Sequence, residues 1–258
     1  KDEVPVAELK TSVDMVMLTD KNVNMMSRYK VYHSSYNELK SLEAYTRVPD
    51  GKKYKTVKIT DQKTTNSSDN NVFYDDVKET SFDFPSLMQN AIAHVEYTQF
   101  QKDAHLLIPF YPPSWQPVAK AVYNVTVPNN IEIKYLVKND PKGLLELSQD
   151  KGKKETTYTW TIRNLKPIDI AGDAPDMRYY EPHVIVYITS FENKAGKQPF
   201  LNTLDDLHRW NYGFIRELNL VPDPYLKKIV DSLINGVKSE RVIAKRIYQW
   251  VQSHIRYV

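Results

Sequence analysis

Alternation of apolar and polar residues dominates the first part of the chain, and this two-residue period is typical of β-strands. The cleanest example is residues 156–165. There Tyr158, Trp160 and Ile162 share one face of the predicted strand. Residues 184–188 form a continuous apolar run instead, as expected for a strand that is buried on both faces. The same reasoning predicts further strands over 13–18, 28–33, 44–48, 54–59, 91–101, 118–127 and 131–137.

Turn residues separate several of these strands. Pro49, Asp50 and Gly51 lie between two strand-like runs. They predict a hairpin, because proline presets the first turn residue and glycine permits a positive φ. The Pro-Asn-Asn sequence at 128–130 joins another pair of predicted strands. Residues 62–72 carry no periodicity and predict a polar loop.

The hydrophobic period changes after Phe200 to the spacing of helices. Residues that favour the N-cap mark three helix starts, at Thr203, Asp223 and Ser239. Gly236 is placed to end the second helix. The end of the chain is therefore expected to be a helical segment.

An apolar stripe runs along the third predicted helix. Its members share one face at a period of 3.6 residues, and they are Ile243, Ile247, Trp250, Val251 and His254. Burial of a large apolar side chain contributes roughly 1.5–3 kcal/mol. We therefore expect Trp250, together with Tyr257 just beyond the helix, to belong to an interaction surface whose partner lies in sequence that is absent here.

The predicted elements define a mainly β (α+β) fold. Many short strands with proline-rich connections favour an antiparallel β-sandwich or a curved open sheet, followed by a C-terminal helical segment. The change of period predicts two parts, a β-rich domain over residues 1–200 and a helical segment over residues 201–258.

Composition excludes several classes of function. The chain has no cysteine, which excludes disulfides, thiolate metal sites, iron–sulfur clusters and a cysteine nucleophile within its 258 residues. Its 7 glycines never fall close together, so they form neither a phosphate-binding loop nor a dinucleotide-binding motif. The net charge of +3 is too small to indicate nucleic acid as a partner. No apolar run approaches the roughly 18 residues of a membrane span.

Titratable residues form no recognisable catalytic or metal site. None of the 6 histidines has a partner at metal-ligand spacing, which favours packing or surface roles. Asp205 and Asp206 point apart on a helix, so they are interpreted as complementing its dipole rather than as paired carboxylates. The stretch around Asp75 and Asp76 lacks the spacing of a calcium loop and is interpreted as solvated. We therefore expect no catalytic residue, no cofactor and no metal.

Aromatic residues are the remaining candidates, and tyrosine is in excess with 18 residues. Most of them lie on predicted strands, where core or cross-strand packing is the favoured interpretation. Tyr111 and Trp115 flank a stretch with two prolines, which keep it out of a central strand. These two residues are therefore the aromatic side chains expected at the surface, where they would stack on sugars or clamp a peptide.

The last predicted helix carries a motif of spaced apolar and aromatic residues. It reads Ala244-x-x-Ile247-Tyr248-x-Trp250-Val251-x-x-x-Ile255-Arg256-Tyr257. This segment resembles the opening helix of the transglutaminase-like, papain-related domain. In that family the segment precedes a Gly-Asp-Cys motif that carries the nucleophile. The resemblance implies that the family's Cys, His and Asp lie beyond residue 258, so that this chain ends within the first helices of a truncated catalytic domain.

Four segments of the β-rich part carry a second resemblance. They are Pro49-Asp50-Gly51-Lys52, Val95-Glu96-Tyr97, Gln116-Pro117-Val118, and Tyr158-Thr159-Trp160 followed by Asn164. Together they resemble the bacterial domain of unknown function 3857, which sits N-terminal to transglutaminase-like domains. Trp210 departs from the pattern, because it lies within the first predicted helix, whereas that family usually has a tryptophan just before this helix. The resemblance implies a fold like the N-terminal β domain of zinc aminopeptidases, in an exported protein that is periplasmic or extracellular.

Two functions fit these observations. The first is a non-catalytic accessory domain of a transglutaminase-like protein of the cysteine protease or amidase type, which supports or orients substrate for a catalytic domain that is absent here. The alternative is a stand-alone, aromatic-rich module that binds a glycan or a peptide. In both cases we expect this chain alone not to be an enzyme, because it has no cysteine nucleophile.

Overall fold

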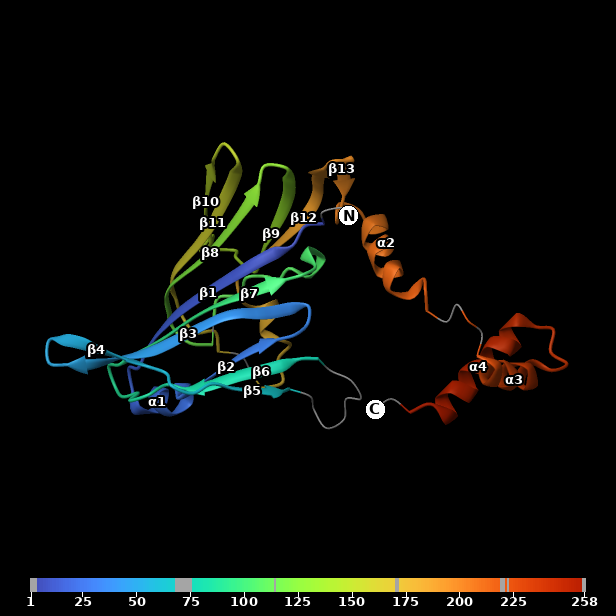
Figure 1. The fold of residues 1–258 in the computed structure, drawn as a ribbon, viewed down its shortest axis with the longest axis horizontal. Helices are drawn as coiled ribbons and strands as arrows, with labels where there is room; N and C mark the ends of the chain where they lie inside the picture. Colours follow the sequence, from blue (N-terminus) through green and yellow to red (C-terminus); the bar gives the residue numbers. More distant parts are fainter. Residues whose placement is uncertain are drawn as a thin grey trace. The chain divides into compact units, whose positions relative to one another are not determined.

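The structure is a computed structural model that describes residues 4–67, 76–113, 115–169, 172–218, 221 and 223–256. It is mostly β, with antiparallel sheets and a C-terminal helical segment (Figure 1). The fold class predicted from the sequence is thus confirmed. The chain divides into two compact units, one of residues 1–67 with 76–206 and one that contains the chain from Leu207 onward.

The described strands and helices have the following bounds. The strands are β1 (Ala7–Val16), β2 (Arg28–His33), β3 (Asn37–Asp50), β4 (Lys53–Lys58), β5 (Lys63–Asn66), β6 (Lys78–Asp83), β7 (Ile92–Gln101), β8 (Val118–Pro128), β9 (Ile131–Lys138), β10 (Glu146–Lys151), β11 (Glu155–Leu165), β12 (His183–Asn193) and β13 (Gly196–Pro199). The helices are α1 (Asp20–Met26), α2 (Leu204–Ile215), α3 (Pro224–Ile234) and α4 (Glu240–His254), with 3-10 turns η1 (Ala104–Leu106) and η2 (Met177–Tyr179). None of the described helices is long and apolar enough to cross a membrane.

These strands form antiparallel sheets, which we name by their central strands. The β7 sheet has the order β1-β7-β3-β4, and the β6 sheet has the order β2-β6-β5. The β11 sheet has the order β10-β11-β8, and the β12 sheet has the order β13-β12-β9. Pairing between β1 and β7 joins residues far apart in sequence, from Ala7 opposite Gln101 to Val16 opposite Ile92.

The β7 and β6 sheets share one hydrophobic core. Alternation places Ala44 of β3 and Val95 of β7 on the inner face, and both are almost fully buried. Phe82 of β6 packs into the same cluster. Helix α1 adds Val23 and Met26 to it. The two sheets are therefore stabilised by apolar burial rather than by shared strands.

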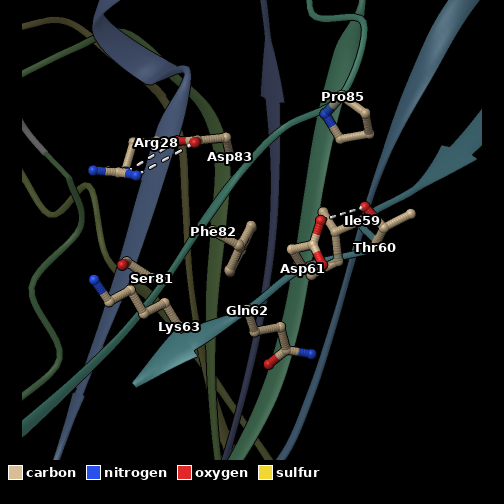
Figure 2. Close-up of a pocket in the computed structure, with 10 residues that line it drawn as sticks. All are labelled: Arg28, Ile59, Thr60, Asp61, Gln62, Lys63, Ser81, Phe82, Asp83 and Pro85. Carbon is tan, nitrogen blue, oxygen red and sulfur yellow. Dashed lines mark hydrogen bonds and ion pairs between the residues drawn. The ribbon is translucent and has the colours of Figure 1, made fainter. Parts of the chain in front are cut away.

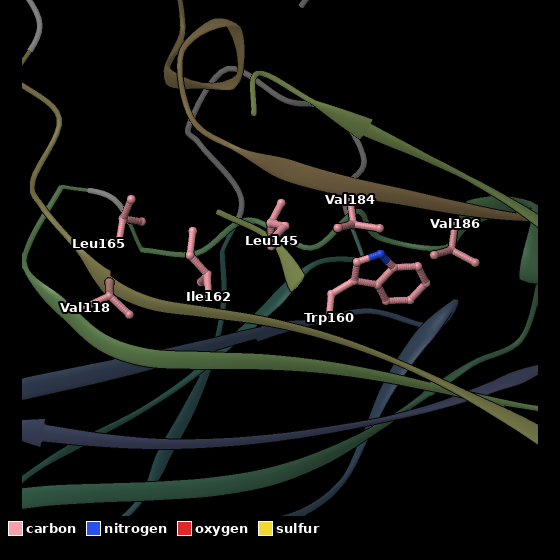
Figure 3. Packing of buried hydrophobic residues seen from close by; sticks show 7 residues of the cluster. All are labelled: Val118, Leu145, Trp160, Ile162, Leu165, Val184 and Val186. Atoms are coloured by element: carbon pink, nitrogen blue, oxygen red, sulfur yellow. The ribbon is translucent and has the colours of Figure 1, made fainter. Parts of the chain in front are cut away.

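The β11 and β12 sheets share a second core around Trp160 (Figure 3). The Trp160 side chain is fully buried, and Ile162 follows it on the same face of β11. Tyr158 stacks near the indole, with 6.1 Å between ring centroids. From β12, Val184 and Val186 complete the cluster. The strand with the cleanest alternation in the sequence thus supplies the centre of this core.

A short connection carries the chain from one of these sheets to the other. Strand β8 pairs with β11, whereas β9 pairs with β12. Two asparagines between them are held by side-chain hydrogen bonds. Asn129 donates from Nδ2 to the Lys153 carbonyl oxygen at 3.1 Å, and Asn130 donates from Nδ2 to the Glu192 carbonyl oxygen at 2.9 Å. The predicted joint at 128–130 therefore links two layers rather than two neighbours in one sheet.

The hairpin predicted at Pro49-Asp50-Gly51 is confirmed, but the role given to proline is wrong. Strands β3 and β4 are joined by the two residues Gly51 and Lys52, and Gly51 has φ +61°. Pro49 lies within β3, opposite Tyr54. A two-residue turn with glycine in its first position matches the twist of the flanking strands, and it begins two residues later than predicted.

Several short elements are absent from the sequence prediction. The predicted loop over 62–72 is wrong at its start, because Lys63–Asn66 form β5 at the edge of the β6 sheet. The rest of that prediction lies largely outside the described residues. Helix α1 and strands β6, β10 and β13 are also additions of the structure. Strand β10 is exposed along its whole length, so no hydrophobic alternation marks it.

The predicted helix boundaries are mostly confirmed. Thr203 accepts a hydrogen bond from the Asp206 backbone N–H at 3.2 Å, and Asp206 accepts one from the Thr203 N–H at 2.9 Å. This reciprocal pair is a capping box, so Asp206 has a more specific role than complementing the helix dipole. Asp223 caps α3 through the N–H groups of Tyr225 and Leu226. Ser239 stands at the N-cap of α4, but its hydroxyl makes no capping hydrogen bond.

Candidate functional site

Tyr111 lies in a short irregular segment that is fixed to the β12 sheet. Its neighbour Phe110 forms a β-bridge with Val184, with N–H to O distances of 2.9 and 3.1 Å. The Tyr111 ring packs over the His183 imidazole, with 4.7 Å between centroids. Pro112 on its other side is fully buried. Tyr111 is therefore held in one position while 36% of it remains exposed.

The turn η2 presents two more tyrosines to solvent. Tyr179 is 67% exposed and Tyr180 is 41% exposed. Asp176 caps the turn by accepting a hydrogen bond from the Arg178 N–H at 3.0 Å, and its other oxygen pairs with the Arg178 guanidinium at 3.0 Å. Asn139 donates from Nδ2 to the Arg178 carbonyl oxygen at 2.8 Å. These contacts fix the backbone that carries the two tyrosines.

Arg178 connects these segments electrostatically. Its hydrogen bond lowers the pKa of the Asp176 carboxyl to about 2. The pKa of Arg178 is raised, first by the hydrogen bond to Asp176 and in smaller part by the nearby phenols of Tyr111 and Tyr179. We call the exposed set of Tyr111, Arg178, Tyr179 and Tyr180 the tyrosine surface. It offers aromatic faces and a paired cation, which suit the binding of a glycan or a peptide better than proton transfer.

The predicted aromatic candidates divide between surface and core. Trp115 is 55% exposed, as the two preceding prolines predict. No ring contact of the described residues joins Trp115 to Tyr111. Tyr158 and Trp160 belong to the core, as the packing interpretation expected. Sequence reasoning groups Tyr179 and Tyr180 with the aromatic residues for which packing is favoured, and this is wrong, because both are exposed on a turn that only the fold brings close to Tyr111.

A shallow pocket of about 290 Å³ lies elsewhere, between the β6 sheet and the segment that follows β4 (Figure 2). The lining residues are Arg28, Ile59, Thr60, Asp61, Gln62, Lys63, Ser81, Phe82, Asp83 and Pro85. Arg28 pairs with Asp83 through two hydrogen bonds, of 3.0 and 3.3 Å. Charges of both signs and a buried ring at Phe82 suit a small polar ligand at most.

Among the described residues, the histidine pairs on β7 and β2 form no complete catalytic set. His94 contacts Asp14 at 2.8 Å, and Arg47 donates to the same carboxylate at 3.0 Å. His33 contacts the Thr80 hydroxyl at 2.9 Å, but Thr80 is only 3% exposed and unavailable to a substrate. Burial, and then the charge of Lys78, lower the pKa of His33. No group of three His, Cys, Asp or Glu among the described residues is arranged to hold a metal ion.

Residues 10–169 match the family described as a domain of unknown function with a solved structure, DUF3857. The chain belongs to this family. The match covers well over half of the chain and includes Tyr111 and Trp115. It ends before η2, β12 and helices α2, α3 and α4, so the DUF3857 match contains only part of the tyrosine surface. No match was found to a curated protein.

A solved structure extends the comparison beyond the DUF3857 match. It is the crystal structure of "a putative protease" from Parabacteroides distasonis ATCC 8503, with a TM-score of 0.70 and 18% sequence identity. The similarity covers 96% of this chain and 47% of that chain. This chain therefore spans about half the length of the structure that it matches. At this identity the similarity establishes a shared fold and nothing further.

The helical segment lies outside the DUF3857 match. Helices α3 and α4 contact one another, and Arg246 of α4 donates a hydrogen bond to the Leu233 carbonyl oxygen of α3 at 3.0 Å. Trp250 is half-buried and stacks on His254, with 4.7 Å between ring centroids. Val251 on the same predicted stripe is 40% exposed. Tyr257, the other predicted interaction residue of this segment, lies outside the described residues.

Proposed function

We propose that this chain is a non-catalytic accessory segment of an exported, transglutaminase-like protein of the cysteine protease or amidase type. The observation that carries the proposal is the shared fold with the protein described as "a putative protease", of which this chain spans 47%. The remaining half of such a protein leaves room for a separate catalytic domain. The DUF3857 part would then support that domain or orient its substrate.

Two features of the chain support a non-catalytic role for this segment beside a separate catalytic domain. Acyl transfer by a papain-related enzyme requires a thiolate, and the chain has no cysteine. Helix α4 resembles the opening helix of transglutaminase-like domains, and Val251 on its apolar face is exposed, as is Ile255 just beyond its end. An exposed apolar stripe of this kind is expected where further sequence of the same protein packs.

The test compares this chain with a longer product of the same gene. Turnover of glutamine-containing peptide amides is measured for residues 1–258 and for the protein continued beyond Val258. We expect background turnover from the first and turnover from the second that a Cys→Ala change abolishes. Turnover by residues 1–258, abolished by a single Ser→Ala change, contradicts the proposal. A continuation without a Gly-Asp-Cys motif contradicts it as well.

The tyrosine surface favours a second candidate function, binding of a glycan or a peptide. The Tyr111 ring packs on the His183 imidazole, so little of its side-chain freedom is lost when a ligand stacks on it, and the η2 turn fixes the backbone that carries Tyr179. The test is a calorimetric titration of the chain with oligosaccharides and with unstructured peptides. Tyr179→Ala is expected to weaken binding, whereas Tyr36→Ala, a control at 51% exposure elsewhere, is not. Equal effects of the two variants would show that binding does not use this surface.

A further inference from the structure

The β7 sheet ends in an open strand edge at β4. In the order β1-β7-β3-β4, β4 has a partner on one side only. Strand β7 accompanies β3 only as far as Arg47, which lies opposite Ile92. Beyond Arg47, β3 and β4 form a two-stranded ribbon that projects past its neighbours (Figure 1). This ribbon is therefore accessible along its outer edge, and Tyr54 on it is 52% exposed.

The register shows which backbone groups face the open edge. A two-residue turn makes its closing residues, Asp50 and Lys53, a hydrogen-bonded pair, and such pairs recur at every second position. The hydrogen bond from the Ile59 N–H to the Ala44 carbonyl oxygen, at 3.2 Å, belongs to the same set. The residues between, Tyr54 and Thr56, must therefore direct their N–H and C=O groups away from β3.

The position of Pro49 agrees with this register. Pro49 lies opposite Tyr54, in a pair that requires no hydrogen bond to β4. On its other side β7 gives Pro49 no partner, because the β7 pairing reaches only to Ile92, opposite Arg47. The missing proline N–H therefore costs the ribbon no ladder bond, and the outward groups of Tyr54 remain free to pair with another chain.

Lysines concentrate on the same ribbon. Lys52, Lys53, Lys55 and Lys58 all lie within residues 52–58, and all are exposed. Lys58 pairs with Glu43 at 3.3 Å. Among the described residues, no ion pair is found for Lys52, Lys53 or Lys55. The ribbon itself carries one acidic side chain, that of Asp50. The edge thus presents unpaired backbone groups together with unneutralised positive charge.

We propose that the β4 edge binds an extended acidic polypeptide segment, which adds to the β7 sheet as a further strand. The outward N–H and C=O groups of Tyr54 and Thr56 would supply the ladder hydrogen bonds. The unpaired lysines would supply charge complementarity. A second β4 edge is a poor partner, because lysines would then face lysines across the new pair. The inference goes beyond the proposed function and stands independently of it.

The test uses the whole chain and a labelled, end-blocked peptide of about ten alternating glutamate and threonine residues. Fluorescence anisotropy gives the dissociation constant of the wild type and of K53Q/K55Q. The matched control is K153Q/K154Q in the turn between β10 and β11, which removes the same charge from another hairpin. We expect about tenfold weaker binding for K53Q/K55Q and less than about twofold change for K153Q/K154Q.

A second pair of variants separates strand addition from charge attraction. Thr56→Pro removes an outward N–H without removing a bond to β3, whereas Thr56→Ala keeps that N–H. We expect about tenfold weaker binding for Thr56→Pro and unchanged binding for Thr56→Ala. A peptide that is N-methylated at alternate residues lacks the N–H donors of an added strand, so it makes the same test on the wild-type protein. Its dissociation constant replaces that of Thr56→Pro if this variant lowers the melting temperature.

Several results would overturn the proposal. Failure of the wild type to bind the peptide removes it outright. Equal losses in K53Q/K55Q and K153Q/K154Q show attraction to overall positive charge. Full binding of the N-methylated probe shows that the ribbon attracts polyanions without forming a strand. Sedimentation that shows a dimer, weakened by Thr56→Pro, assigns the edge to a second copy of this chain.

Discussion

Trp160 combines complete burial with an unsatisfied polar group. Its side chain is fully buried, and its indole N–H has no hydrogen-bond partner among the described residues. An unpaired buried donor costs about 1–3 kcal/mol. The surrounding contacts offset this cost, because Tyr123 and Tyr158 stack near the indole and Val184 packs against it. At this position the area and shape of the ring matter more than its donor.

Trp160→Ala is therefore expected to destabilise the β-rich unit by about 3–5 kcal/mol, through the cavity that it leaves between the β11 and β12 sheets. Trp115→Ala is the matched control, because Trp115 is 55% exposed, and it should change the free energy of unfolding by less than about 0.5 kcal/mol. Denaturant unfolding followed by circular dichroism measures both. Similar losses in the two variants would show that Trp160 does not lie at the centre of the core.

Asp176 should titrate well below an ordinary aspartate. Its pKa is lowered from 3.8 to about 2 by the hydrogen bond from Arg178. A lowered pKa in the folded state contributes stability above pH 3.8, and this contribution is lost as the pH falls towards 2. In an NMR titration of the carboxyl carbons, Arg178→Gln should return the Asp176 pKa towards 3.8. An Asp176 pKa near 3.8 in the wild type would contradict the observed pairing.

At the scale of elements, the sequence predicts long strands with one buried face and not the short edges. Strand β11 was predicted because its buried residues alternate with less buried ones around Trp160. Strands β5 and β10 are exposed on both faces, so a period of two in hydrophobicity cannot mark them. Tyr111 was predicted at the surface from local proline chemistry. Its neighbours on η2 were not, because their proximity depends on pairing between segments about 70 residues apart in sequence.

Two glycines provide a matched pair of tests of local geometry. Gly51 in the β3–β4 turn has φ +61°, whereas Gly213 lies within helix α2, and an added Cβ meets nothing within 4 Å at either site. Gly51→Ala should destabilise the protein by about 1 kcal/mol through backbone strain alone. Gly213→Ala should stabilise α2 by up to about 1 kcal/mol. Thermal unfolding measures both, and effects of the same sign would contradict the conformations assigned to the two glycines.

At the scale of the whole molecule, the two compact units differ in how completely they bury apolar surface. The β-rich unit has clusters of fully buried residues around Val95 and Trp160. Helices α3 and α4 contain no buried residue. Apolar side chains such as Leu226, Tyr248 and Ile255 remain substantially exposed there. The helical unit is thus the part of the described chain with the larger potential for further association.

Trp250→Ala tests the contribution of the half-buried stripe on α4. We expect it to lower the stability of the helical unit by about 1–2 kcal/mol and to alter self-association, because Trp250 is the largest side chain of the stripe. Gln249→Ala, next to it on an exposed face, is the control. Light scattering and thermal unfolding provide the two measurements. Unchanged mass and melting temperature in Trp250→Ala would show that the tryptophan is solvated and that the stripe does not take part in association.

The distant pairing of β1 also has a consequence for synthesis. The ribosome completes β1 at Val16, but the partner strand β7 begins only at Ile92. At roughly 5–20 residues per second, the intervening chain takes on the order of 4–15 s to make. During this interval Val13 and Met15 have no β7 to cover them. The nascent chain is therefore exposed to early, incorrect contacts, and slowing translation before Ile92 should lower the yield of folded protein more than slowing it afterwards.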